Sequence, residues 1–92
     1  MLPHVLAYNL SVTAKRQGEL CEQIGERKKK LHETISELVS ILGLPSRLRD
    51  CNISRNLLPK LAQECLNDKW LETNPIPLTD ANEIEKILLQ AW

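Results

Sequence analysis

The sequence predicts an all-α fold, a small bundle of four to six helices. Seventeen leucines stand against three valines, Phe is absent, and the only aromatic residues are Tyr8, Trp70 and Trp92. Leucine loses little rotamer freedom in a helix, whereas strands are rich in β-branched and aromatic residues. The 92 residues, with 42% hydrophobic and 26% charged side chains, suit one small folded domain rather than a disordered chain.

Two helical segments are expected before residue 26. Residues 2–9 form a short apolar piece whose Pro3 falls in a first turn, where a helix tolerates a residue without an N–H. Ser11 is a candidate N-cap for a second segment, and Gly25 is placed to end it. The expected apolar face of this second segment consists of Leu20, Cys21 and Ile24.

The clearest amphipathic pattern follows. Apolar residues recur at helical spacing, and they are Leu31, Ile35, Leu38 and Leu42. We expect Leu38 to lie buried at the centre of this stripe. The helix should end at Gly43, which can take a left-handed conformation, with Leu44 folding back and Pro45 preventing continuation.

Two further helices are expected in the second half, after irregular turns over residues 46–54. Pro59 requires the first of them to begin near Asn56, and its apolar face consists of Leu57, Leu58, Leu61, Ala62 and Cys65. Residues 74–77 must be extended because of their two prolines. Thr79 and Asp80 are expected to cap the last helix, whose apolar stripe is Ala81, Ile84, Ile87, Leu88 and Ala91.

Charge and cysteine content exclude several classes of protein. The net charge is zero, which removes the usual electrostatic basis for nucleic-acid binding, and the basic run at residues 27–30 is interpreted as a solvated helix start. No apolar stretch is long enough for a membrane span and no secretory signal is apparent, so we expect a cytoplasmic protein. Three widely spaced cysteines fit free thiols better than disulfides or a zinc site.

Three segments taken in order resemble the C-terminal part of the iron-containing alcohol dehydrogenases. They are LPHVLAYN at residues 2–9, LGLPSRLRD at residues 42–50 and TNPIPLT at residues 73–79. The resemblance covers essentially the whole chain and implies that residues 1–92 are a single, partial helical domain. It also implies that the N-terminal nucleotide-binding domain and the metal-ligand segment of the family are absent from this chain.

The resemblance implies a nicotinamide-linked alcohol or aldehyde oxidoreductase that uses Fe or Zn and NAD(P) in its full-length form. The family's Asp and three His ligands and its Gly-rich cofactor loop all lie upstream of the matched segments. No catalytic, cofactor-binding or metal-binding residue can therefore be assigned here, and we expect the chain to be inactive alone. The substrate alcohol, the choice between iron and zinc, and the choice between NAD and NADP stay open.

The residues that could carry chemistry otherwise have ordinary structural interpretations. A metal site needs three or four convergent donors, and neither His4 nor His32 has such partners in sequence. We interpret His4 as a partly buried structural histidine and His32 as exposed on the basic edge of its helix. Ser11, Ser36 and Cys51 have no recognisable base beside them, and Arg47, Arg49 and Asp50 form at most an exposed ion-pair turn.

Two residues are candidates for lining a substrate cleft. The resemblance implies that the segment before the Asn-Pro turn approaches the substrate side of the metal site. This segment contains Trp70 and Thr73. The alternative is that Trp70 covers helix ends as a hydrophobic lid.

The alternative function for the whole chain is a small helical interaction module derived from the same fold. Under either function, the expected partner is a second copy bound through the apolar N-terminal segment, or else the missing N-terminal part of the enzyme.

Overall fold

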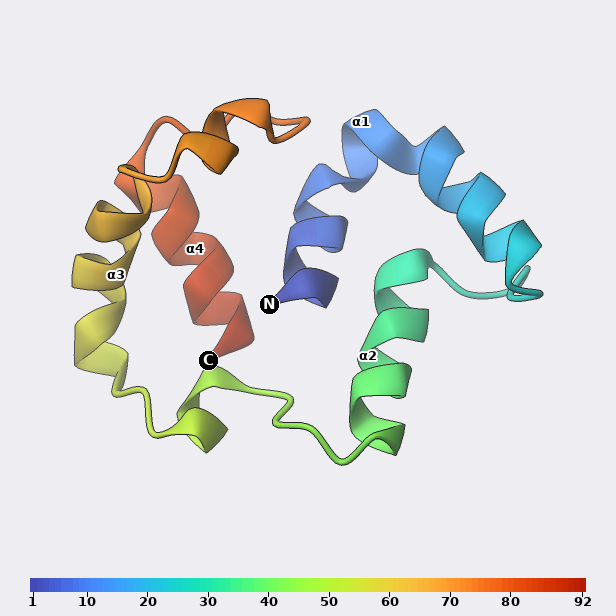
Figure 1. Ribbon diagram of the computed structural model, residues 1–92, viewed down its shortest axis with the longest axis horizontal. Helices are drawn as coiled ribbons and strands as arrows, with labels where there is room; N and C mark the ends of the chain where they lie inside the picture. Colours follow the sequence, from blue (N-terminus) through green and yellow to red (C-terminus); the bar gives the residue numbers. More distant parts are fainter. The chain divides into compact units, whose positions relative to one another are not determined.

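The computed structural model describes residues 1–92 and contains helices and no strand, so the predicted all-α class is confirmed (Figure 1). The four α-helices are α1 (Leu2–Gln23), α2 (Leu31–Ile41), α3 (Leu58–Cys65) and α4 (Ala81–Ala91). Three short 3₁₀ helices lie between α2 and α4: η1 (Leu48–Cys51), η2 (Arg55–Leu57) and η3 (Lys69–Thr73). The chain forms two compact units, Met1–Ser46 and Arg47–Trp92.

The N-terminal unit consists of α1 and α2, which pack against each other. The prediction of two segments separated before Ser11 is wrong, because α1 runs without interruption from Leu2 to Gln23. Pro3 lies in its first turn as expected. Ser11 is an exposed residue inside the helix rather than an N-cap.

Helix α1 bends sharply in its first half (Figure 1). The Gln17 Nε2 atom donates a hydrogen bond of 2.9 Å to the Leu6 carbonyl, eleven residues earlier in the same helix. In a straight helix these residues would be about 16 Å apart along the axis, farther than a glutamine side chain reaches. The Thr13 hydroxyl also donates to the Asn9 carbonyl at 2.7 Å, a side-chain bond that often accompanies helix bending. The bend falls where the sequence suggested a break.

Both helices of the N-terminal unit end in the same hydrogen-bonded motif. Gly25 and Gly43 have φ of 81° and 68°, a left-handed conformation that glycine adopts without steric cost. The Glu26 N–H donates to the Cys21 carbonyl at 2.8 Å, and the Leu44 N–H donates to the Val39 carbonyl at 3.1 Å. These bonds close Schellman motifs, which confirms the predicted ends of both helices.

The apolar stripe of α2 is buried at its beginning only. Leu31 is buried, and Ile35 and Val39 are half-buried. The prediction that Leu38 lies at the centre of the core is wrong, because 48% of Leu38 is exposed, as is 62% of Leu42. Helix α1 is the main packing partner of α2 within this unit, and it leaves the Leu38 side of the stripe uncovered.

The C-terminal unit contains most of the buried apolar side chains. Helices α3 and α4 pack against each other, and Leu58 and Ala62 of α3 are fully buried. The predicted stripe of α4 is confirmed at its buried positions, Ile84, Ile87, Leu88 and Ala91. Pro59 lies in the first turn of α3, and the Asp80 carboxylate caps α4 by accepting the Asn82 N–H at 2.9 Å.

None of the helices combines the length and the apolar character that crossing a membrane requires.

Candidate functional site

Trp70 and Thr73, the predicted cleft residues, lie together on η3. The Asp68 carboxylate accepts the Trp70 N–H at 3.0 Å and so starts this short helix. The Thr73 hydroxyl donates to the Trp70 carbonyl at 2.9 Å. The Trp70 side chain is 80% exposed, so it does not cover helix ends and the lid interpretation is wrong. An exposed indole beside a threonine is a surface that can contact a ligand or another protein segment.

The extended segment after η3 is held by its own hydrogen bond and by burial. The Asn74 amide donates to the Ile76 carbonyl at 2.6 Å, and Leu78 is buried. This arrangement fixes the Asn-Pro turn that the sequence predicted, and it attaches the Trp70 segment to the start of α4.

The structure brings the two histidines to one small cavity of about 350 Å³ between α1 and α2. His4 comes from the first turns of α1 and His32 from the start of α2, with Glu33 and Glu37 on the same wall. His4 is half-buried, as predicted. Burial lowers the pKa of His4 below 6.5, and the positive charges of the N-terminus and of His32 lower it further.

His32 does not lie where the sequence predicted. It is half-buried rather than exposed, and its Nδ1 atom is buried without a hydrogen-bond partner. The prediction failed because α1 packs against α2, and the local sequence around His32 does not indicate this packing. The cavity that both histidines line was likewise missed.

The two histidines do not form a metal site. The Glu33 carboxylate accepts the Lys30 N–H at 2.8 Å and caps α2, and Glu37 pairs with Lys29 at 2.7 Å. No three His, Cys, Asp or Glu side chains in the chain lie close enough together to hold a metal ion. Metal centres need three or four convergent donors, and the two histidines supply only two.

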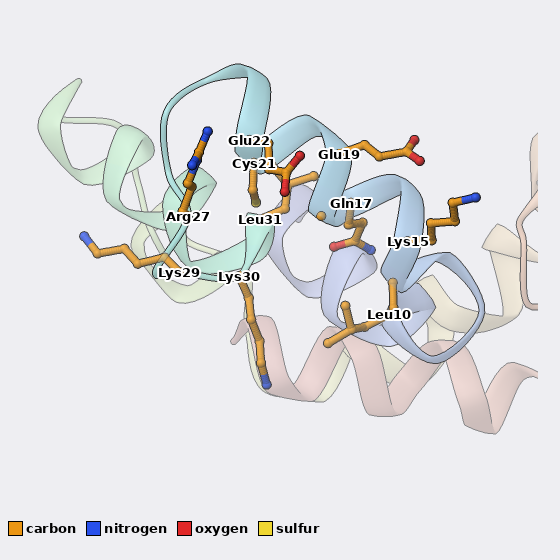
Figure 2. Close-up of a pocket in the computed structure, with 12 residues that line it drawn as sticks. Leu10, Lys15, Gln17, Glu19, Cys21, Glu22, Arg27, Lys29, Lys30 and Leu31 are labelled. Carbon is orange, nitrogen blue, oxygen red and sulfur yellow. The ribbon is translucent and has the colours of Figure 1, made fainter.

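A second cavity, of about 550 Å³, lies beside Gln17 (Figure 2). Its lining combines the small or apolar residues Leu10, Ala14, Gly18, Cys21 and Leu31 with a mixed-charge rim. Figure 2 shows Arg27, Lys29 and Lys30 leaving the cavity in different directions. The cations therefore do not converge on a single point, as an anion site would require.

The basic run at residues 27–30 precedes α2 and is exposed, as the solvated interpretation expects. The hydrogen bond that Lys29 donates to the Glu37 carboxylate raises the pKa of Lys29 above its ordinary value of 10.5. The three cysteines are free thiols, with Cys21 buried and Cys51 exposed, in agreement with the prediction.

The segment around η1 contains a tertiary contact that sequence reasoning missed. The Trp92 Nε1 atom donates a hydrogen bond of 2.9 Å to the Ile53 carbonyl. The guanidinium carbons of Arg49 and Arg55 lie 5.4 and 5.7 Å from the centroid of the same indole. Asp50 accepts the Arg47 backbone N–H at 3.2 Å, so it acts as a cap of η1. Arg49 was expected in an ion-pair turn and is instead a cation–π partner.

Comparison with known proteins identifies the class to which this helical chain belongs. The model of the Fe-containing alcohol dehydrogenase family, C-terminal part, matches residues 1–92. The chain belongs to this family, as the three sequence segments predicted. No solved structure gives a significant match.

Two kinds of curated relative are similar to the chain over its whole length. Lactaldehyde reductase of Escherichia coli (strain K12) is 28% identical over 101 aligned positions, and 1,3-propanediol dehydrogenases of Citrobacter freundii and Klebsiella pneumoniae are 29% identical. In each case the match covers 100% of this chain and 26% of the relative. The chain therefore spans about a quarter of the length of the curated relatives it matches.

Proposed function

We propose that this chain is the C-terminal helical part of a nicotinamide-linked oxidoreductase that interconverts a small alcohol and its aldehyde. The observation that supports the proposal is the family match over all 92 residues. Relatives named for lactaldehyde and for 1,3-propanediol suggest a short, hydroxylated substrate. Free thiols at all three cysteines are compatible with a reducing compartment such as the cytoplasm.

Within such an enzyme the role of this chain is structural and positional. Iron and NAD(P) serve the full-length family, and when bound the metal supplies Lewis-acid polarisation of the substrate oxygen. In this chain no three His, Cys, Asp or Glu side chains lie close enough together to hold a metal ion. We therefore propose that residues 1–92 bind neither iron nor nicotinamide usefully and have no activity alone.

Trp70 and Thr73 are the residues we propose for the wall of the substrate cleft. Both are exposed on η3, and the fixed Asn-Pro turn behind them holds this segment in place. An exposed indole with an adjacent hydroxyl provides an apolar surface and a hydrogen-bonding group, which suits a short alcohol.

The direct test is complementation. The purified chain is assayed with NADH or NADPH for lactaldehyde reduction, with Fe(II) or Zn(II) added, alone and after joint refolding with the part of E. coli lactaldehyde reductase outside the matched quarter. We expect no turnover from either piece and turnover from the two together. Turnover by the chain alone would contradict the proposal. An inactive pair would also contradict it, provided that the relative's own matched quarter restores activity to the same part of the reductase.

A second candidate function is a small interaction module that keeps the fold without the enzyme. It is favoured by the exposure of large apolar side chains, of which Leu2 at the start of α1 is 57% exposed. In this case the chain pairs with a second copy through the N-terminal part of α1, where Val5, Leu6, Tyr8 and Leu10 are half-buried. Light scattering of wild type and of a Val5→Asp, Leu6→Asp variant tests this, because a dimer would give a mass near twice 10.5 kDa that the substitutions abolish.

A further inference from the structure

The two units differ in how much core they contain. Nine apolar side chains of the chain are buried, and the Met1–Ser46 unit supplies only two of them, Cys21 and Leu31. The same unit supplies nine of the twelve large apolar side chains that are exposed. A contiguous exposed apolar patch marks an interaction site in soluble proteins. The N-terminal unit therefore resembles one side of a protein interface whose partner is not present.

Four of the nine exposed apolar residues of this unit lie on one side of α2 and in its C-terminal turn. Leu38 is 48% exposed, Ile41 81% and Leu42 62%. Residues three and four positions apart share a helix face, so these side chains form one continuous surface, which we call the α2 face. Leu44, immediately after the Schellman turn, is exposed next to it.

The unpartnered polar atoms of the chain lie in the same unit. Gln17 Oε1 and His32 Nδ1 are buried without a hydrogen-bond partner, which is energetically unfavourable. No such side-chain atom occurs in the Arg47–Trp92 unit. The N-terminal unit therefore has both the fewer buried apolar side chains and the buried polar atoms without a partner.

Taken alone, the α2 face is too small to hold a second copy stably. Three side chains on one helix present a few hundred Å², whereas a stable pairing buries about 800 Å² per partner. The curated relatives, by contrast, carry about three quarters of their length outside the match. A partner of that size can cover the α2 face together with the exposed apolar residues of α1, such as Val12 and Leu20.

We propose that the α2 face, formed by Leu38, Ile41 and Leu42, is the docking surface for the part of the alcohol dehydrogenase fold that relatives carry outside the matched quarter. The complementary surface is aliphatic, because the α2 face offers only Leu and Ile side chains. This proposal rests on the proposed function, and it adds the surface through which the helical part joins the rest of the enzyme.

The test compares two double variants. Ile41→Gln with Leu42→Gln makes the α2 face polar while keeping good helix formers. Ser36→Gln with Ser40→Gln places the same side chains on exposed serines of the same helix and is the matched control. Each chain is refolded with the part of E. coli lactaldehyde reductase outside the match, and association is measured by size-exclusion chromatography with light scattering.

We expect wild type and the serine control to co-elute with the partner and the α2-face variant to bind at least tenfold more weakly. The urea midpoint of the α2-face variant alone should equal that of wild type. A lowered midpoint would show that the α2 face is already packed within the chain, and a wild-type dimer lost in the variant would show that a second copy covers it. Either result overturns the proposal, as does equal binding of both variants or no binding by wild type.

The docking proposal and the proposed function can fail separately. If wild type and the α2-face variant restore lactaldehyde reduction equally well, the enzymatic assignment stands and the docking surface is wrong. If wild type associates through the α2 face but restores no activity, the docking surface stands and the enzymatic assignment is wrong.

Discussion

Substitution of Trp92 should destabilise the C-terminal unit, because this residue connects segments that are distant in the sequence. Its Nε1 atom donates to the Ile53 carbonyl at 2.9 Å, across 39 residues. Arg49 and Arg55 lie within 6 Å of its ring centroid. The contact holds the segment around η1 against the end of α4. The packing of α3 against α4 does not make this connection.

The expected losses follow from these contacts. The hydrogen bond contributes about 1 kcal/mol, and each partly exposed cation–π contact contributes about 0.5–1 kcal/mol. Trp92→Phe removes the hydrogen bond and weakens the cation–π contacts, so it should cost about 1–2 kcal/mol. Trp92→Ala also removes the packing of a half-buried ring and should cost about 2–4 kcal/mol, less than a fully buried aromatic residue would.

Urea unfolding of chains carrying Trp70→Phe provides the assay. The Trp70 side chain is 80% exposed, so its replacement should change the free energy of unfolding by less than about 0.5 kcal/mol. Trp92 is then the only tryptophan, so its fluorescence reports unfolding. Helical circular dichroism reports unfolding of the variants that lack Trp92. If Trp92→Ala shifts the free energy of unfolding by less than about 0.5 kcal/mol, the contacts at the end of α4 do not stabilise the unit.

Three further predictions concern the core, helix α1 and pH. Leu58→Ala should cost about 2–5 kcal/mol because Leu58 is fully buried, whereas Leu38→Ala should cost less than about 1 kcal/mol; equal losses in urea unfolding would contradict this. Gly18→Ala should stabilise the chain by about 1 kcal/mol, since a Cβ at Gly18 meets no atom within 4 Å; a lower melting temperature would refute it. Because the pKa of His4 is lowered from 6.5 in the folded chain, the unfolded chain binds more protons near and below pH 6.5, and stability should fall as the pH decreases from 7.5 to 5.5. His4→Gln should reduce this fall in the urea midpoint, and an unchanged fall would assign it to other groups.

Local sequence determined where the helices end. Glycine at positions 25 and 43 is the residue that adopts the left-handed conformation of a Schellman motif. Pro59 could lie only in a first turn, and Asp80 could cap only the helix that follows it. These features depend on one to five neighbouring residues, so the sequence alone predicts them.

The family was also recognisable from sequence, because three motifs occur in a fixed order. The part of the candidate site that follows from the family is the assignment of Trp70 and Thr73, and it stays a prediction. The histidine pair could not be found in this way. His4 and His32 line the same cavity only because α1 and α2 pack against each other, and the sequence of neither helix indicates that packing.

Tertiary packing decided which face of α2 is buried. The apolar residues of α2 extend around more of the helix than one neighbour can cover, so periodicity identifies the stripe but not its buried edge. Leu31 is buried and Leu38 is not, since burial depends on where α1 lies. The position of α1 depends in turn on its bend, which a hydrogen bond between Gln17 and Leu6 stabilises across eleven residues. Side-chain contacts over such separations are set by the folded chain as a whole, and no local pattern specifies them.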